Sequence, residues 1–362
     1  MRRLLLSVIV LSLLPSIGSA GPNKFHTKYQ VVELNQKLHG CVIDFTNNHR
    51  VDRRFWSEAL CQKRDMYVYL PPGYAPDERY PLMIWLHGFI QDEKKFLDLI
   101  VVFDREIAAG RLPPMIIASP DGSIAGRVSL LNGGSFYLNS RAGRFEDYLI
   151  VDVWNLIVTN FPIRPEPEAH VLNGVSMGGF SACNLGIKHR DRFKVVSGIM
   201  PPLNLRFQDC HGNYFGKFDP DCIGWTERYN PHSTIAVLFG FFHVRQRHML
   251  DPLYGRHRHG VIRDLSRENP TEMLEAHNVK PGEMSMFVGY GDADEFNVGA
   301  QAESFTYFAA KRGIEKPTTV VIPCGKHDSE TALKMLPQFV AWLAPLLKPY
   351  APPLKLREPC LE

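Results

Sequence analysis

Hydrophobic residues along this chain fall into short apolar runs that alternate with longer segments in which apolar positions recur at helical spacing. The run at residues 80–86 is continuous and ends before Gly88, which is typical of a strand covered on both faces. Residues 145–159 instead place most of their apolar side chains near one face of a helix. The expected strands are residues 28–44, 65–70, 80–86, 115–119, 170–175, 193–200, 284–291 and 318–323, and the expected helices are residues 145–159, 177–189, 299–312 and 329–347. Strands that alternate with helices predict an α/β fold, in which helices cover both faces of a mostly parallel central sheet.

This alternation stops in one segment, residues 201–269. The segment holds too many aromatic residues for a disordered linker, and it would leave the sheet at the C-terminal edge of a strand, where ligands bind in such folds. We therefore expect a cap-like insertion there. The expected organisation is an N-terminal strand-rich segment at residues 21–78, an α/β domain with the cap at residues 79–350, and a C-terminal tail at residues 351–362.

The composition is that of an ordinary globular protein. The chain has 362 residues, of which 45% are hydrophobic and 22% charged, and this excludes a disordered, collagen-like or coiled-coil chain. The formal net charge of +3 is too small to indicate nucleic acid or a membrane surface as the partner. No pattern at ligand spacing indicates a metal, and none indicates a cofactor. The oligomeric state stays open.

The first twenty residues have the layout of a secretory signal peptide. Arg2 and Arg3 precede an apolar stretch at residues 4–17, and small residues at positions 18–20 suit a signal peptidase. A membrane anchor is the alternative, but the stretch is shorter than the ~20 residues that span a bilayer, and no later segment is apolar for long enough. We expect a secreted or periplasmic protein in which residues 1–20 are removed and no membrane span remains.

Seven cysteines fit an oxidising compartment without proving it. Cys183 lies on an expected helix, where a buried thiol is the usual finding. Sequence cannot choose among the fifteen pairings of the other six. Proximity favours the pairs Cys41–Cys61, Cys210–Cys222 and Cys324–Cys360.

Residues 174–178, Gly-Val-Ser-Met-Gly, match the G-x-S-x-G pattern of a nucleophile elbow. As a bare pattern the match is weak, since a chain of this length gives one by chance on the order of one time in ten. Its context is specific, because it lies between an expected strand and an expected helix, as the turn requires. We expect Ser176 to be a nucleophile.

A serine hydroxyl needs a base, and in elbow proteins the chain order is serine, acid, histidine. His327 is the only histidine C-terminal to the acid candidates, Asp292, Asp294 and Glu295. The acid should accept a hydrogen bond from the imidazole and hold its tautomer. We favour Asp294, and we expect its two acidic neighbours to cap the following helix.

A developing oxyanion needs two preorganised N–H donors. The backbone N–H of Met177 is one candidate, because it directly follows the nucleophile. The N–H of Phe89 is the other, since Gly88 lets the loop after an early strand approach a substrate closely. His87 precedes the serine in the chain, and we expect it to brace this loop.

Taken together, these residues resemble the esterase D-like esterases, a group of α/β hydrolases that includes feruloyl and acetyl-xylan esterases, siderophore esterases, S-formylglutathione hydrolase and the mycolyltransferases. The resemblance covers about residues 64–347 and rests on residues 68–74 (Val-Tyr-Leu-Pro-Pro-Gly-Tyr), 86–88 (Leu-His-Gly), 145–148 (Phe-Glu-Asp-Tyr), 174–179 (Gly-Val-Ser-Met-Gly-Gly), 294–297 (Asp-Glu-Phe-Asn) and 325–327 (Gly-Lys-His). It implies an α/β-hydrolase fold and strengthens Asp294 as the acid of the triad. Residues 201–269 match no member, so the substrate does not follow from the resemblance.

The sequence therefore predicts an exported serine carboxylic-ester hydrolase that works through an acyl-enzyme on Ser176. The substrate is expected to be a small-molecule or carbohydrate-linked ester. One alternative is an acyltransferase that hands the acyl group to a sugar hydroxyl; another is an inactive carbohydrate-binding protein on the same scaffold. Basic residues of the cap, including Arg256 and Arg258, are expected to form a solvated face or, alternatively, to receive an anionic substrate.

Overall fold

The computed structural model describes residues 28–128, 133–255 and 260–356. The expected signal peptide at residues 1–20, Cys360, and Arg256 and Arg258 of the expected cap lie outside these ranges. Among the described residues, no helix combines the length and the apolar character needed to cross a membrane.

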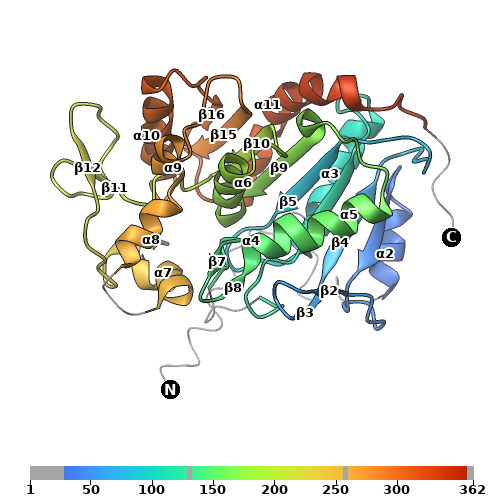
Figure 1. Cartoon of the computed structure of the whole chain (residues 1–362), viewed down its shortest axis with the longest axis horizontal. Helices are drawn as coiled ribbons and strands as arrows, with labels where there is room; N and C mark the ends of the chain where they lie inside the picture. Colours follow the sequence, from blue (N-terminus) through green and yellow to red (C-terminus); the bar gives the residue numbers. More distant parts are fainter. Residues whose placement is uncertain (1–27, 129–132, 256–259, 357–362) are drawn as a thin grey trace.

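An eight-stranded sheet forms the centre of the molecule (Figure 1). Its first three strands pair antiparallel at one edge, and every later pair is parallel, in agreement with the expected mostly parallel sheet. The strand order is β1 (Cys41–Phe45), β4 (Met66–Leu70), β6 (Ile116–Pro120), β5 (Leu82–Leu86), β9 (His170–Val175), β10 (Val195–Ile199), β15 (Ser285–Gly291) and β16 (Thr318–Ile322). Among the described residues, four two-stranded sheets lie outside it, and two of them precede β9: β2 (Phe55–Ser57) with β3 (Gln62–Arg64) and β7 (Asn139–Ser140) with β8 (Gly143–Arg144).

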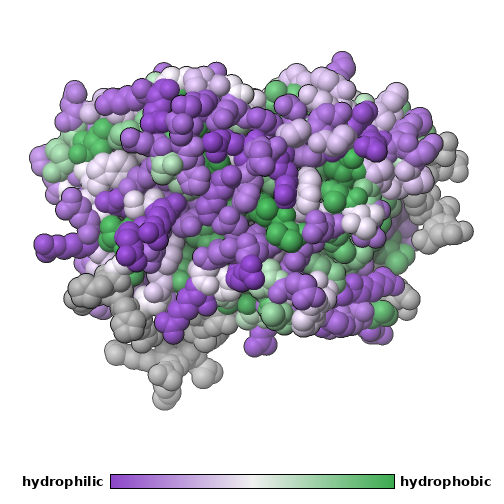
Figure 2. Space-filling model, in the orientation of Figure 1, coloured by the Kyte–Doolittle hydropathy of each residue, from purple (hydrophilic) through white to green (hydrophobic). Residues whose placement is uncertain are grey.

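Helices cover both faces of this sheet, because alternate residues of each strand point to opposite sides. Tyr67 and Tyr69 of β4 pack with one set of helices, and Met66 and Val68 pack with the other. The first set is α2 (Lys28–Asn35), α3 (Lys95–Ala108) and α11 (Ser329–Leu347); the second is α4 (Phe145–Asp147), the π-helix η2 (Tyr148–Val153), α5 (Trp154–Asn160), α6 (Met177–Lys188), α9 (Pro270–Ala276) and α10 (Val298–Lys311). Two short 3-10 turns, η3 (Pro167–Ala169) and η4 (Lys348–Tyr350), complete the layers. Figure 2 shows that the outer surface of one side is mostly hydrophilic, with hydrophobic residues in small separate patches.

The strand expected over residues 28–44 is wrong for most of its length. Helix α2 occupies its first part, and only β1 is extended. The reason is the spacing of Val31, Leu34 and Leu38, which are all buried in the core beside α3 and α11. That spacing follows the helical period, and the loose alternation of polar residues between them misled the strand assignment.

The segment at residues 201–269 leaves the sheet after β10 and contains two hairpins and two helices. These are β11 (Phe207–Asp209) with β12 (Ile223–Trp225), β13 (Thr234–Leu238) with β14 (Phe242–Arg245), α7 (Gln246–Tyr254) and α8 (Val261–Arg267). In Figure 1 the first hairpin and both helices lie at the end of the molecule where α9 and α10 are found. The described part of the segment therefore consists of hairpins and helices, and it follows the carboxyl end of β10.

One of the three favoured disulfides is present, between Cys210 and Cys222, where it joins the ends of β11 and β12. The pair Cys41–Cys61 is wrong, because Cys61 is an exposed thiol whose sulfur donates to the carbonyl of Glu58. Cys183 is a buried thiol, as expected, and burial raises its pKa to about 12. Cys324 is exposed, and its favoured partner Cys360 lies outside the described residues.

Candidate active site

Ser176 occupies the turn between β9 and α6, and its backbone is strained. Its φ is 53° and its ψ is −116°, a region that residues other than glycine seldom adopt. The turn is this tight because its glycines allow it: a Cβ on Gly174 would collide with the carbonyl of Gly178, and a Cβ on Gly178 with the carbonyl of Leu86. The Ser176 N–H donates to the carbonyl of Ile199 at 2.8 Å, which ties the turn to β10. The strained turn presents a partly accessible serine at the carboxyl ends of the strands.

The structure brings Ser176, His327 and Asp294 into one chain of hydrogen bonds. Nε2 of His327 lies 2.8 Å from Oγ of Ser176, and its Nδ1 lies 2.6 Å from Oδ2 of Asp294. Asp294 follows β15, and His327 lies in the loop between β16 and α11. The Asp294 side chain is only 1% exposed, whereas the imidazole is 14% exposed. The aspartate is thus shielded from water, and the histidine keeps access to the serine.

The environment of His327 raises the pKa of its imidazole above the ordinary value of 6.5. Burial by itself lowers this pKa, because it disfavours the charged form. The negative charge of Asp294 and the hydrogen bond to it outweigh the effect of burial, and the charges of Glu295 and Asp328 add to them. The site therefore favours an imidazole that holds a proton taken from Ser176.

The orientation of Asp294 is set by the residues that follow it. The Phe296 N–H donates to Oδ1 of Asp294 at 2.8 Å, so Oδ2 is left to face the imidazole. The Phe296 ring also packs against His327, with the ring centroids 4.7 Å apart. The segment after β10 contacts this loop, since the Tyr214 hydroxyl donates to the Phe296 carbonyl at 2.8 Å. The loop that carries the acid is thus held by its own backbone and by Tyr214.

The two acidic neighbours of Asp294 do not cap the next helix, contrary to the sequence expectation. Helix α10 begins after Asn297 with no side-chain cap. Oδ1 of Asp292 instead accepts from the Cys324 N–H at 2.6 Å, and Oε2 of Glu295 accepts from the His327 N–H at 2.9 Å. Both carboxylates thus fasten the loop that carries His327, a role that depends on β15 and β16 being neighbours in the sheet.

Two backbone N–H groups stand beside the Ser176 turn as candidate oxyanion donors. Met177 is the first residue of α6, where a helix leaves its N–H without an intrahelical partner. Phe89 lies in the loop after β5, and a Cβ on the preceding Gly88 would lie 3.5 Å from the Val175 carbonyl. Within the described ranges, neither N–H donates to another residue. Both donors are therefore available to a ligand.

His87 holds the peptide between Gly88 and Phe89 in one orientation. Its Nε2 accepts from the Gly122 N–H at 2.8 Å, which places the proton on Nδ1, and Nδ1 lies 2.9 Å from the Gly88 carbonyl oxygen. The C=O and N–H of a trans peptide point in opposite directions, and no peptide in the described residues is cis. The Gly88 carbonyl points toward His87, so the Phe89 N–H of the same peptide points away from His87.

A buried ion pair between Arg64 and Asp121 holds the loop that contacts His87. Nη2 of Arg64 lies 2.9 Å from Oδ2 of Asp121, and both side chains are fully buried. The same guanidinium donates to the Asp121 and Ser123 carbonyls at 2.8 and 2.6 Å. Burial would raise the pKa of Asp121, but the Arg64 charge holds it at about 2, so the carboxylate stays ionised. The pair fixes the loop after β6, whose Gly122 N–H in turn fixes His87.

A further loop at residues 133–137 borders the site and was not found from the sequence. A Cβ on Gly134 would collide with Sδ of Met177 and lie 2.7 Å from the Phe89 ring. The Phe136 N–H lies 3.4 Å from the same sulfur, and its ring lies 6.0 Å from the Phe89 ring. The available signal in the sequence was the glycine pair Gly133–Gly134, followed after one serine by Phe136 and Tyr137.

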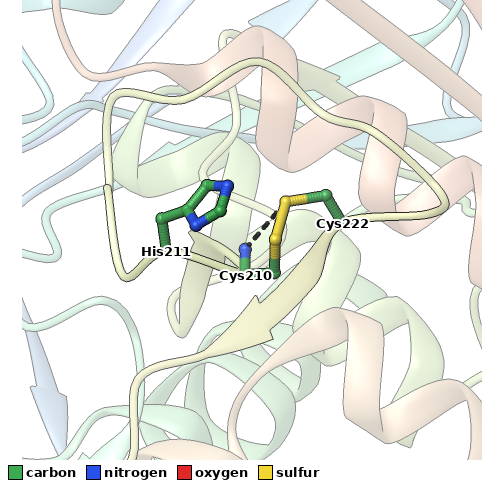
Figure 3. Close-up of side chains that lie close together, drawn as sticks. All are labelled: Cys210, His211 and Cys222. Atoms are coloured by element: carbon green, nitrogen blue, oxygen red, sulfur yellow. Dashed lines mark hydrogen bonds between the residues drawn. A yellow bond between two sulfur atoms is a disulfide. The ribbon is translucent and has the colours of Figure 1, made fainter.

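Cys210, His211 and Cys222 offer ligand atoms within 4.8 Å of one another, as a metal site would (Figure 3). Their two sulfurs are bonded to each other, however, so neither is available as a thiolate. In this state the cluster presents a single ligand, His211.

Known proteins resemble this chain in sequence. A family model described as "Putative esterase" matches residues 57–272, more than half of the chain, and the protein belongs to this esterase family. An S-formylglutathione hydrolase from Arabidopsis thaliana is 26% identical over 208 residues, which are 51% of this chain and 71% of that protein. The protein is a carboxylic ester hydrolase.

Solved structures show the same fold. A ferulic acid esterase superposes with a TM-score of 0.59 at 18% identity, covering 86% of this chain and 99% of its own. An S-formylglutathione hydrolase from Agrobacterium tumefaciens also superposes with a TM-score of 0.59, at 19% identity, covering 86% of this chain and 96% of its own. The α/β-hydrolase fold expected from the sequence is thereby confirmed.

Proposed function

We propose that this ester hydrolase is a serine esterase that works through an acyl-enzyme on Ser176. The observation that carries the proposal is the hydrogen-bond chain from Ser176 through His327 to Asp294, with distances of 2.8 and 2.6 Å. A nucleophile, a base and an orienting acid within hydrogen-bond reach are what acyl transfer needs.

In the first half of the proposed reaction, Oγ of Ser176 attacks the ester carbonyl carbon while Nε2 of His327 takes the hydroxyl proton. The carbonyl oxygen becomes an oxyanion, which accepts hydrogen bonds from the N–H groups of Met177 and Phe89. Asp294 keeps the Nδ1 proton in place and stabilises the imidazolium. When the tetrahedral intermediate collapses, the imidazolium protonates the leaving alcohol and the acyl group stays on Ser176.

In the second half, water takes the place of the alcohol. His327 removes a proton from the water as it attacks the acyl carbon, and the same two N–H groups hold the second oxyanion. Collapse returns the proton to Oγ of Ser176 and releases the acid. The alternative outcome, transfer to a sugar hydroxyl, uses the same acyl-enzyme and differs only in the acceptor.

Three further segments of the chain are assigned proposed roles in export, catalysis and bounding of the site. We propose residues 1–20 as a signal peptide that exports the enzyme, residues 79–350 as the catalytic domain, and residues 201–269 as a cap that bounds the site. Tyr214 supports the cap assignment through its contact with the loop of Asp294. Ferulate esters and S-formylglutathione, named in the relatives, are the first substrates to try.

The test combines labelling with a substrate panel. A fluorophosphonate probe should label wild-type protein at Ser176, and mass spectrometry of the tryptic peptide should locate the adduct. Hydrolysis of feruloyl, acetyl-sugar, S-formylglutathione and p-nitrophenyl esters, with and without an added sugar acceptor, would then rank substrates and separate hydrolysis from transfer. An unlabelled, inactive protein would favour the inactive carbohydrate-binding alternative.

Activity should depend on pH through His327, which must be neutral to accept the serine proton. Its pKa is raised above 6.5 by Asp294, so kcat/KM should fall as the pH is lowered through a midpoint above that value. The profile of p-nitrophenyl acetate hydrolysis against pH measures this midpoint. Full activity retained well below pH 6.5 would contradict the assignment.

His87→Phe is expected to lower kcat about tenfold with little change in KM, because it removes one of the two hydrogen bonds to the Gly88 carbonyl that orient the Phe89 N–H, the other coming from the Gln91 N–H at 3.2 Å. The matched control is His170→Phe. His170 is also buried and also contacts backbone groups through both ring nitrogens, in its case two carbonyls, but it lies at the opposite end of β9 from Ser176. The control should lose stability without this loss of kcat; equal kcat values in the two variants would count against the proposed role of His87.

A further inference from the structure

The loop that carries Asp294, residues 292–297 (the acid loop), is contacted by a second loop at residues 210–222. The second loop connects β11 to β12, and a disulfide between Cys210 and Cys222 closes it; we call it the disulfide loop. The Cys210 N–H also donates to the Cys222 carbonyl at 3.1 Å. A closed loop has fewer conformations available than an open one, so this loop offers the acid loop a restrained support.

Tyr214 of the disulfide loop binds the backbone of the acid loop through its hydroxyl. The hydroxyl donates to the Phe296 carbonyl at 2.8 Å, and Nε2 of Gln301 donates to the same hydroxyl at 3.1 Å. Since the Phe296 N–H donates to Oδ1 of Asp294, the residue that orients the carboxylate is held at its other end by Tyr214. Burial raises the pKa of the Tyr214 hydroxyl and the charge of Asp294 raises it further, so the hydroxyl keeps its proton and remains a donor.

Asn297 makes the reciprocal contact, from the acid loop to the disulfide loop. Its Nδ2 donates to the Tyr214 carbonyl at 2.6 Å and to the Gly216 carbonyl at 3.0 Å. An asparagine directly before a helix usually caps that helix with its side chain, but α10 has no side-chain cap. Helix capping therefore does not explain this side chain, whereas its two bonds to the disulfide loop do.

We propose that Tyr214 and Asn297 are positioning residues, which keep Asp294 against the imidazole by holding the acid loop on the disulfide loop. The proposal rests on the proposed function, because it concerns the same triad. Among the described residues, the imidazole nitrogens bond only to Ser176 and Asp294, so Tyr214 and Asn297 act on the rate through Asp294. A displacement of about 1 Å at a catalytic group can cost on the order of 100-fold in rate, and the loss of one of several holding contacts should cost less.

Tyr214→Phe removes the hydroxyl but keeps the ring and the charge of the protein. For p-nitrophenyl acetate, kcat should fall about tenfold with little change in KM. The midpoint of the kcat/KM profile against pH should also move down by at least about 0.5 pH unit, because a displaced Asp294 raises the pKa of His327 less. The matched control is Tyr229→Phe, which removes another hydroxyl of the same segment, one that donates to the Asp251 carboxylate. The control should lower Tm and leave kcat and the midpoint unchanged.

Asn297→Gly tests the same contact from the acid loop. The backbone of Asn297 is left-handed, with a φ of 52°, and glycine adopts this conformation without strain. This variant should lower kcat and the midpoint as Tyr214→Phe does. Asn278→Gly is its control, because Asn278 also has a positive φ, of 49°, while its side chain bonds to Nζ of Lys280 at the surface. The control should have wild-type kinetics.

End-point labelling with the fluorophosphonate probe counts the active molecules in each preparation, so that misfolded protein does not lower the measured kcat. A fall in kcat with an unchanged midpoint would indicate a merely structural role and would overturn the proposal. Wild-type kinetics in either Tyr214→Phe or Asn297→Gly would overturn it as well. A wild-type protein that is neither labelled nor active would instead refute the proposed function, and this inference would fall with it.

Discussion

Replacing Ser176 with alanine is expected to abolish turnover of a short p-nitrophenyl ester, with kcat falling by about 10⁶-fold. Turnover is lost because, within the described residues, no group other than the Ser176 hydroxyl lies at hydrogen-bond distance from Nε2 of His327. Folding should be preserved, since among the described residues the Ser176 hydroxyl bonds only to His327, and alanine fits the same turn. Initial rates with p-nitrophenyl acetate, together with a thermal melt, check both parts.

The matched control for this variant is Ser197→Ala. Ser197 is a buried serine of β10 whose hydroxyl has no hydrogen-bond partner among the described residues, so its removal should leave both rate and stability unchanged. A Ser176→Ala variant that retains wild-type activity would remove the basis for the acyl-enzyme. The fluorophosphonate label should be lost in Ser176→Ala alone.

Asp294→Asn is expected to lower kcat by about 10⁴-fold while leaving the geometry of the site almost unchanged. The Phe296 N–H faces Oδ1 of Asp294, so the asparagine oxygen must take that position to accept the hydrogen bond. The amide NH₂ then faces Nδ1 of His327 and forces the ring proton onto Nε2. An imidazole with its proton on Nε2 cannot accept the proton of Ser176.

Asp292→Asn provides the comparison, because the two aspartates lie in one loop and differ in what they contact. Among the residues that the structure describes, Oδ1 of Asp292 accepts only the Cys324 N–H, and an asparagine oxygen can take over that bond. We expect kcat to fall by less than about tenfold in this variant. Steady-state kinetics of both variants would decide between the acids, and a larger loss for Asp292→Asn would make Asp292 the acid of the site.

Much of the fold could be predicted because its signals are local. The strand at residues 170–175 and the helix at residues 329–347 were found with the bounds that the structure gives to β9 and α11, since uninterrupted periodicity defines both. Helix α3 was not assigned, and α2 was taken for a strand. In both, the buried residues recur at helical spacing, as at Phe96, Ile100, Phe103 and Ile107 of α3, so the local signal was present and was not used.

The candidate site shows the same division. The G-x-S-x-G pattern could be recognised because the tight turn leaves no room for a Cβ at its two glycine positions. The base could be assigned because only one histidine follows the acid candidates in the chain. The roles of Glu295, Asp292 and the loop at residues 133–137 were missed, because each depends on a partner more than 30 residues away in sequence. Spacing along a chain carries no information about such pairs.

The sequence by itself determined an alternating α/β chain, a strained serine turn and a short set of residues able to complete it. Only the tertiary structure decided which carboxylate meets the imidazole and how the peptide at Gly88 is turned. The physical reason is that periodicity and turn chemistry act between neighbours in the chain. Hydrogen bonds between loops instead depend on which strands are neighbours in the sheet, and here the relevant strands are β5, β6, β9, β15 and β16.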